Sequence, residues 1–496
     1  MVSASDRVRR PGFLHSLLTL ACVCLDSLLS SACSLSHNHY LLIDKNLRAG
    51  HYEAADELVA KAEAEYGAKG RVLFGMDRGL TLQLAGQYDA SNQVLSAAED
   101  EVERLFTRKI RNEALSFLVN DNELPFEGDP YEQVMINVVK AINYAMQQNW
   151  QEALVEARRL DHRLNVIADR ETDRDAYRDD GFARYVTGIL YEAGGDLNNA
   201  MVAYRRAYDA YRSTGVGRRI GVPAALRSDL IRVSEALGLS SESQEYRQAF
   251  PEATWQPVRA QRRLAQVVLI SYNGRAPARV DQFLDVPLGL DAARLVLLSR
   301  GLGGGTNRPR AADSLLYGLN GRIVRVALPR LIPQPTSVSA SQVILAASES
   351  TFQDRTEPMQ SITALAQQSL AERLPGITTR AAARSAIKYG LAEAAERSVY
   401  SATRGRGGQQ NDLQWVAFIA GALIRTAALA TEESDKRSWR TLPDEIQLAR
   451  LWVPAGEYEV QVRALGVGTK PRGPALPPHL VLREGETRFL LDRIVQ

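Results

Sequence analysis

Residues Gly188–Ala207, GILYEAGGDLNNAMVAYRRA, carry the pattern that decides the fold of the first half of the chain. A small residue is followed three positions later by an aromatic one, then by a Gly-Asp turn, and then by Ala, Tyr and Ala at steps of four and three. Such steps place side chains on one face of a helix. We interpret the stretch as two helices joined by a tight turn. Small residues let the helices approach closely, and aromatic residues fill the groove between them.

The same pattern occurs three more times upstream. The positions equivalent to Ala200 are residues 55, 91 and 153, and a weaker fifth copy spans residues 222–250. A helix pair with an uncovered apolar face is stable only when a neighbouring pair covers that face. The spacing is typical of tetratricopeptide repeats, and it predicts a helical solenoid over residues 34–250. The aromatic residues of two repeats are candidate contacts for a protein partner in the groove: Tyr144, Trp150, Tyr191 and Tyr204.

Two insertions make the copies irregular. Residues 120–131 (NDNELPFEGDPY) are rich in turn formers, and residues 169–180 (DRETDRDAYRDD) are dense in charge. Insertions in a solenoid often emerge on one face and shape a binding surface. Solvated loops without such a role are an equally good interpretation, and both stay open at this point.

Strand patterns replace helix patterns near Pro251. Residues 267–272 (VVLISY) are apolar and rich in β-branched side chains, and Asn273-Gly274 is a hairpin turn signal that predicts pairing with residues 280–286. Further strands are expected at residues 323–328, 343–346, 452–462, 480–482 and 487–491. Alternating apolar and polar positions around Pro and Gly turns predict a β-sandwich-like domain.

The strand patterns fall into two parts, residues 251–358 and 432–496, separated by Ala-rich sequence. We therefore expect a helical insertion over residues 359–431. It either packs on its parent sheet, which we favour, or reaches a partner or a membrane surface.

The first 33 residues predict an export signal. Three arginines (7, 9 and 10) precede an apolar run over residues 13–25, which is shorter than the about 20 residues needed to cross a bilayer. Ser30-Ser31-Ala32 then precedes Cys33, and this end resembles a bacterial lipobox. We expect Cys33 to become the lipid-bearing first residue. A simple secretory signal, a misassigned start codon or cleavage before Cys22 are the alternatives.

Composition and motifs point away from several functions. The chain has 60 basic and 58 acidic residues, and this balance gives no reason to expect a nucleic-acid partner. No cysteine follows Cys33, which excludes Cys-based metal sites from the body of the protein. The pair His37 and His39 lies in an expected linker, and residues 301–306 (GLGGGT) lack the Lys-Ser/Thr of a phosphate-binding loop. We therefore expect no metal, no cofactor and no catalytic residue.

Three segments resemble a family of bacterial lipoproteins with tetratricopeptide repeats. They are residues 125–132 (PFEGDPYE), 177–185 (YRDDGFARY) and 435–443 (DKRSWRTLP). The resemblance covers most of the chain after Cys33. It implies a lipoprotein of the cell envelope, and it brings no known activity or catalytic residue with it.

The leading expectation is a non-enzymatic scaffold with a lipid anchor that binds a partner protein of the cell envelope through the groove of the solenoid. Ser34, rather than the Asp that retains lipoproteins at the inner membrane, favours the periplasmic face of the outer membrane. One alternative is a regulator of peptidoglycan synthesis that contacts a synthase. A less favoured one is a cell-wall-acting enzyme with carboxylates near Trp439. The oligomeric state stays open.

Overall fold

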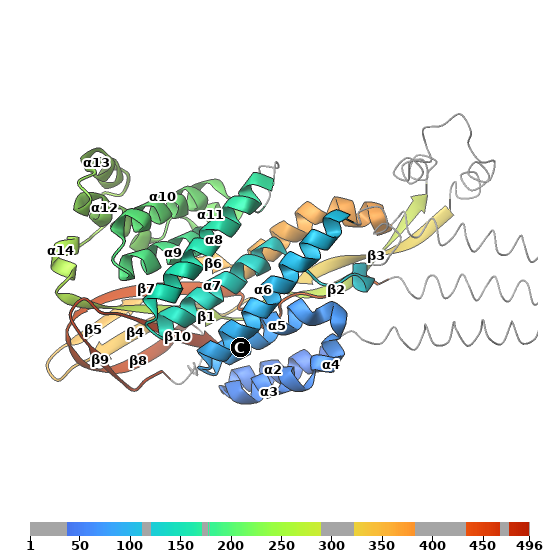
Figure 1. Ribbon diagram of the computed structural model, residues 1–496, viewed down its shortest axis with the longest axis horizontal. Helices are drawn as coiled ribbons and strands as arrows, with labels where there is room; N and C mark the ends of the chain where they lie inside the picture. Colours follow the sequence, from blue (N-terminus) through green and yellow to red (C-terminus); the bar gives the residue numbers. More distant parts are fainter. Residues whose placement is uncertain are drawn as a thin grey trace, which may run out of the picture.

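The computed structural model describes residues 37–111, 121–170, 177, 179–288, 322–381, 433–466 and 476–495. Helices α2 to α14 precede the strands, in the predicted order (Figure 1). The helices are α2 (His37–Ala49), α3 (Tyr52–Lys61), α4 (Glu63–Tyr66), α5 (Arg71–Leu84), α6 (Tyr88–Arg111), α7 (Pro130–Met146), α8 (Trp150–Arg170), α9 (Gly181–Ala193), α10 (Leu197–Ser213), α11 (Gly215–Ile220), α12 (Ala224–Ala236), α13 (Ser240–Ala249) and α14 (Val258–Gln261), with short 3-10 turns at Ala68–Gly70 and Asp121–Glu123. The strands are β1 (Leu264–Asn273), β2 (Ala278–Leu288), β3 (Arg322–Ile332), β4 (Val338–Ala346), β5 (Thr351–Arg355), β6 (Glu357–Ser361), β7 (Glu445–Pro454), β8 (Gly456–Gly466), β9 (His479–Leu482) and β10 (Thr487–Ile494). A further helix spans residues 362–381.

The predicted helix pairs are confirmed, and they share one turn. We call the pairs α2–α3, α5–α6, α7–α8, α9–α10 and α12–α13 the helical array. In the turn of α9–α10, the amide of Gly195 donates to the carbonyl of Glu192 at 2.9 Å, and the next amide donates to Tyr191 at 2.8 Å. The same two bonds recur in each pair, and they require a residue with positive φ. The residues in that position are Gly50, Gly86, Gly195 and Gly238, with φ from +71° to +85°, and Gln148, with φ +58°.

Small residues in the first helix of a pair allow close packing of the second helix. A Cβ atom built on Gly188 would lie 2.4 Å from the ring of Tyr204, which is inside the contact distance of any side chain. Glycine at this position therefore lets the Tyr204 ring lie directly on the backbone of α9. This contact is the physical basis of the small-then-aromatic spacing in the sequence.

Among the described residues of the second part, the strands form two four-stranded sheets and one two-stranded ribbon. The first sheet has the order β10-β1-β7-β6, the second has the order β5-β4-β8-β9, and β2 pairs with β3. Strand β1 is central in the first sheet, parallel to β10 and antiparallel to β7. The last strand of the chain thus lies beside the first strand of this part, which ties the two ends of the sheet region together.

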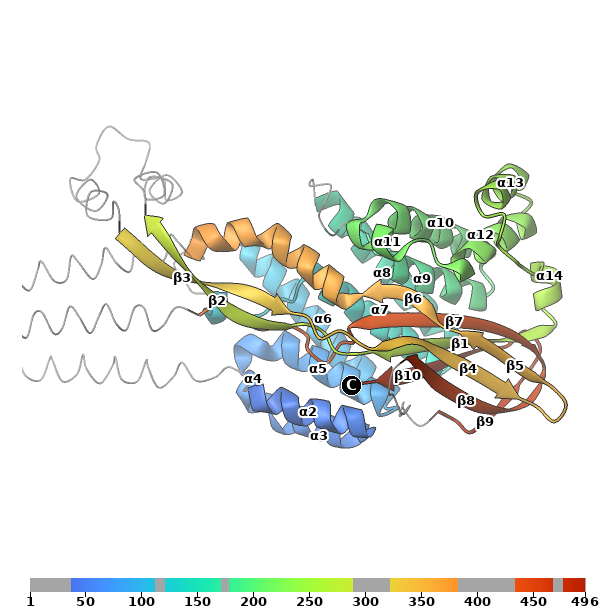
Figure 2. The same cartoon turned by 180° about the vertical axis from the view of Figure 1, so that it is seen from behind.

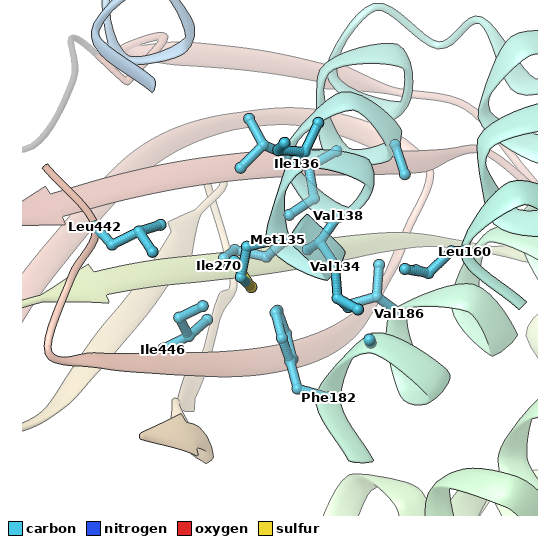
Figure 3. Packing of buried hydrophobic residues seen from close by; sticks show 14 of the residues in the cluster. Val134, Met135, Ile136, Val138, Leu160, Phe182, Val186, Ile270, Leu442 and Ile446 are labelled. Carbon is cyan, nitrogen blue, oxygen red and sulfur yellow. The ribbon is translucent and has the colours of Figure 1, made fainter. Parts of the chain in front are cut away.

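The molecule has three layers, with the first sheet in the middle (Figures 1 and 2). Along β1, Val268 and Ile270 belong to the core shared with the helical array, whereas Val267 and Leu269 belong to the core shared with the second sheet. Alternate side chains of a strand point to opposite faces, so a sheet covered on both sides reads as a continuous apolar run. Figure 3 shows Ile270 near Met135 of α7. The chain changes near residue 250 from mostly helical to mostly strand structure, but this change does not separate two cores.

The expected hairpin between residues 267–272 and 280–286 is wrong. Gly274 does form a turn, with φ +68°, but β1 and β2 then enter different sheets, and β2 pairs with β3 instead. Residues 452–462 likewise form two strands, β7 and β8, separated at Ala455. Turn signals are local, whereas the choice of partner strand depends on segments distant in the sequence.

Two further expectations differ from the structure. Residue 359 lies in strand β6, and the helix begins at residue 362, so the start of the expected helical insertion is wrong; residues 382–432 lie outside the described residues. His37 and His39 belong to helix α2 and not to a linker. Cys33 and the expected signal also lie outside the described residues. In the described part of the chain, no helix combines the length and apolar character needed to cross a membrane.

Candidate functional site

Arg450 on β7 extends into the inner face of the helical array, and its side chain is 3% exposed. Its guanidinium donates to Glu192 of α9 at 3.0 Å and forms an ion pair with Asp229 of α12. Arg232 binds the same two carboxylates, at 2.6 Å to Glu192 and 2.8 Å to Asp229. Two buried guanidinium groups are thus balanced by two buried carboxylates. Burial alone would raise the pKa of Glu192, but Arg232 and Arg450 hold that pKa well below its usual range.

A second cluster of charges forms at the start of helix α7. Asp129 precedes the helix, Pro130 is its first residue, and Glu132 accepts a hydrogen bond from the amide of Asp129 at 2.7 Å. This bond belongs to a capping box, and the carboxylate of Asp129 also pairs with Arg279 of β2 and with Arg373 of the 362–381 helix. Burial tends to raise the pKa of Asp129, but the two guanidinium groups lower it.

Glu132 connects this cluster to the segment before β7. It accepts a hydrogen bond from the amide of Trp439 at 2.8 Å and is fully buried. Burial, and next the charge of Asp129, raise the pKa of Glu132 to about 7. The side chain of Trp439 is buried too, and its indole N–H donates to Thr441 at 2.9 Å.

Asp77 of α5 is the centre of a third buried cluster. It accepts hydrogen bonds from the hydroxyl groups of Tyr40 at 2.9 Å, Tyr66 at 2.9 Å and Thr441 at 2.8 Å. Burial raises the pKa of Asp77 to about 6, although the three hydroxyl donors oppose this shift. Since Thr441 belongs to the segment before β7, this carboxylate also joins the array to the sheet.

A fourth contact ties α9 and α10 to strand β6. Asp180 caps α9 by accepting from the amide of Ala183 at 2.9 Å, and its other oxygen accepts from Gln360 of β6 at 2.6 Å. The hydroxyl of Tyr211 donates to the carbonyl of Met359 at 3.0 Å. Burial raises the pKa of Asp180 to about 6.

We call these four buried polar clusters the helix–sheet joint; they are centred on Arg450, Asp129 with Glu132, Asp77 and Asp180. The three segments that carry the family resemblance all contribute to it: Asp129 and Glu132 from 125–132, Asp180 from 177–185, and residues 439 and 441 from 435–443. Asp129 and Asp180, near the ends of the two insertions, are therefore part of neither a free loop nor an open binding surface, because they bind Arg279 of β2 and Gln360 of β6.

The four aromatic residues predicted as partner contacts are not equivalent. Tyr204 is fully buried and donates to Glu192 at 2.7 Å, and Tyr191 is 5% exposed, so neither presents a surface to a partner. The prediction is wrong for these two residues, because Tyr204 is covered by Arg450, which donates to its hydroxyl at 3.3 Å, and Tyr191 is buried beside Asp161 of α8. Tyr144 and Trp150 are partly exposed. The ring of Trp150 lies 6.3 Å from that of Phe489 on β10.

The residues of the joint were missed as a site, although the sequence contains signals for some of them. Asp129-Pro130 followed by Glu132 matches a helix start, which explains the local role but not the contacts with Arg279 and Trp439. Arg450 lies on the same face of its strand as Ile446 and Leu448. A single arginine on an otherwise apolar face indicates that a buried carboxylate pairs with it. The sequence does not say which carboxylates that partner supplies.

A small cavity of about 40 Å³ lies beside Asp129. Arg279, Arg373, Ser434 and Asp435 contribute its polar lining. This volume has room for ordered water and is far below the size of a typical pocket for a small-molecule ligand. Among the described residues, no group of three or more His, Cys, Asp or Glu side chains is placed to hold a metal ion. The arrangement of the joint is suited to holding two parts of the chain together.

No protein-family model and no curated protein matches the chain. Among solved structures, it is similar to "MamA AMB-1 P212121", with 13% identity and a TM-score of 0.26, over 43% of this chain and 89% of that one. It is also similar to the Rap conjugation gene regulator of the plasmid pLS20 in complex with the Phr* peptide, with 12% identity and a TM-score of 0.26, over 79% of this chain and 75% of that one. Likenesses at this level carry no conclusion about fold or function.

Proposed function

We propose that the chain is a non-enzymatic scaffold of the bacterial cell envelope, held by lipid on Cys33 at the periplasmic face of the outer membrane, which binds a partner protein with an outer edge of its composite body. The observation that carries this proposal is the insertion of Arg450 between Glu192 and Asp229. It makes the helical array and the β-sandwich-like sheets one rigid platform. A platform of this kind is suited to holding other proteins in a fixed geometry.

The state of the buried acids supports a structural role over a catalytic one. Asp77 and Asp180 have raised pKa values, as catalytic acids often do, but each is enclosed by hydrogen-bond donors of the chain itself. A general acid must come within hydrogen-bond reach of a substrate. Of the residues of the joint, the cavity described above is lined by Asp129, Arg279 and Arg373, and both arginines form ion pairs with Asp129. The pKa of Asp129 is lowered, which is the opposite of what a general acid needs.

The partner surface that the structure favours is the edge where the α7–α8 turn meets β10. Tyr144 and Trp150 are partly exposed there, and Gln148 donates to Glu486, just before β10, at 2.7 Å. Partly exposed aromatic side chains on a rigid support are typical of binding hot spots. This edge replaces the inner groove as the proposed contact site, because the groove is filled by the chain's own sheet.

Photo-crosslinking in cells tests the proposed edge. Trp150 is replaced by a photoreactive phenylalanine analogue in the full chain, and adducts are identified by mass spectrometry. We expect one dominant adduct with an envelope protein. Val202, an exposed apolar residue of α10, is the matched control position and should give no such adduct. Equal adducts from both positions, or none from residue 150, would overturn this contact site. A synthase as the partner would instead favour the role in peptidoglycan synthesis.

The anchor has a separate test. Mass spectrometry of the purified protein should find an acylated Cys33 as the first residue, and Cys33→Ala should move the protein from the membrane fraction to the soluble fraction. An unmodified cysteine together with unchanged fractionation of the variant would refute the anchor and leave the platform itself untouched.

A further inference from the structure

Helix α2 is held rigidly by its inner face. Tyr40 and Ile43 are buried, and the hydroxyl of Tyr40 donates to Asp77 at 2.9 Å. Asp44 accepts from Arg275, just after β1, at 2.8 Å, and the guanidinium of Arg440 lies 4.3 Å from the centre of the Tyr40 ring. The helix is therefore fixed to both the array and the sheet region, and its outer face has a defined direction.

The outer face of α2 combines apolar and basic side chains. Leu41 is 46% exposed and Leu42 is 49% exposed, and Lys45 and Arg48 are exposed as well. Since a helix turns by about 100° per residue, these four side chains lie within an arc of about 120°. In the described part of the chain, neither Lys45 nor Arg48 forms an ion pair with another side chain. Helices α2 and α3 lie at one edge of the molecule in both views (Figures 1 and 2).

The distance to the proposed anchor restricts where this face can be. His37, the first residue of α2, is four residues after Cys33. Four residues span at most about 14 Å, and Leu41 is about 6 Å further along the helix. If lipid on Cys33 enters a bilayer, the outer face of α2 is within about 20 Å of the headgroups.

We propose that the outer face of α2, formed by Leu41, Leu42, Lys45 and Arg48, lies on the membrane surface, with the leucines among the acyl chains near the headgroups and the two cations against anionic phosphates. This inference rests on the proposed lipid anchor and adds an orientation to it. A helix with apolar and basic residues on one side is the pattern of interfacial membrane contact. Membrane contact through α2 would hold the array and the sheet in one direction relative to the bilayer.

The charge on the neighbouring helix limits the tilt. Glu53 and Glu57 of α3 are exposed, and an anionic surface repels them, although Lys61 pairs with Glu57 at 3.0 Å. The two helices therefore do not lie flat on the membrane together. The contact is confined to α2, with α3 turned away from the headgroups.

The experiment uses the full chain purified from membranes and reconstituted in vesicles of phosphatidylethanolamine and phosphatidylglycerol. Leu42→Cys is labelled with the environment-sensitive fluorophore NBD, and Val202→Cys is the matched control. We expect the emission at residue 42 to rise about twofold in vesicles and to be quenched by lipids with spin labels on their acyl chains. Residue 202 should show neither effect.

The basic residues are tested in the Cys33→Ala background, where no lipid masks weak binding. Each cation close to an anionic surface strengthens binding about fivefold, so Lys45→Gln with Arg48→Gln should weaken sedimentation with these vesicles about 25-fold. Glu53→Gln with Glu57→Gln should not weaken it. The result should depend on salt, because the attraction is screened.

The outcomes separate the two proposals. An acylated Cys33 with a water-like, unquenched label at residue 42 would overturn the membrane contact of α2 and leave the anchor standing. An unmodified Cys33, together with a lipid-quenched label on Leu42→Cys in the Cys33→Ala background, would support the contact and refute the anchor. An emission change that needs no vesicles and grows with protein concentration would show that a second copy of the chain covers this face, which also overturns the proposal.

Discussion

Single buried charges hold the helices on the sheet, and Arg450 is the clearest case. Its guanidinium neutralises Glu192 and Asp229 together with Arg232, and the side chains of all four residues are largely withdrawn from water. A buried ion pair contributes little net stability compared with well-packed apolar residues, but removing one member leaves the other charge uncompensated. Arg450 therefore acts mainly on the register and orientation of β7 against the helical array, because the two guanidinium groups and the two carboxylates pair in this position of the strand.

Arg450→Met should lower the free energy of unfolding by about 3–5 kcal/mol, because two carboxylates are then left with one guanidinium. Urea unfolding followed by circular dichroism measures this change. Arg463→Met, on the exposed side of β8, is the matched control and should change stability by less than about 0.5 kcal/mol. Similar losses in both variants would show that the buried cluster has no special role.

The raised pKa of Asp77 predicts that the protein is more stable in mild acid than at pH 8. Its pKa in the folded protein is about 6, above the value of 3.8 of an unperturbed Asp, so the fold binds the proton more tightly than the unfolded chain does. Stability should rise as the pH falls from 8 through 6 and level off near 4, by up to about 3 kcal/mol for a shift of two pKa units. Asp180 acts in the same direction.

Asp77→Asn should reduce this rise, because an amide does not titrate. Urea unfolding at pH 8 and at pH 5 measures the difference in both proteins. A wild-type protein that loses stability steadily between pH 8 and pH 5, or a variant with an undiminished rise, would contradict this account of the third cluster.

The helix pair is the element that the sequence encodes most directly, and two glycines of one pair serve it in different ways. Gly195 provides positive φ in the turn, with open space around it, whereas Gly188 provides contact with Tyr204. The turn position accepts Gln in the pair α7–α8, where Gln148 has φ +58° and its side chain binds Glu486. A turn residue can thus be replaced when another contact offsets the backbone strain.

Gly188→Ala and Gly195→Ala separate these two roles. The first should destabilise the protein by about 1–3 kcal/mol through overpacking against the Tyr204 ring. The second should cost about 1 kcal/mol through backbone strain, and Gly195→Asn should restore part of it because Asn tolerates positive φ. Thermal unfolding of the three variants provides the comparison. Equal losses for Gly195→Ala and Gly195→Asn would argue against strain as the cause.

At the scale of the whole molecule, one apolar core extends from the helices to the first sheet. It contains Tyr40 at one end of the array, Ile231 near the other, and Val268 and Phe489 in the sheet. The helical and strand parts follow each other along the chain, but they share this core, and we therefore expect them to unfold cooperatively as one unit. This unity removes the inner groove as a site for partners and leaves the outer edges for recognition.

Hydrogen exchange measured by mass spectrometry tests this unity. Amides of α9 and of β1 should exchange through the same opening, with equal free energies of protection, because neither layer keeps a complete core without the other. Arg450→Met should lower both values by the same amount. Protection that stays high in the helices while the sheet exchanges would show two independent units.

The periodic spacing of small and aromatic residues was sufficient to predict the helix pairs and their turns, and the β-branched apolar runs were sufficient to predict the change to strands. Each of these signals depends on neighbours within about 20 residues of one another. The helix start at Asp129 was visible for the same reason. The pairing of β1 with β7 and β10, and the covering of Tyr204 by Arg450, join residues more than 170 positions apart. A continuous apolar run along a strand, as in β1, shows that both of its faces are buried, but it carries no information about the neighbouring strand. The neighbouring strand of β1 is decided by the arrangement that buries the apolar faces and pairs the buried charges at the same time. Such an arrangement exists only in the folded molecule.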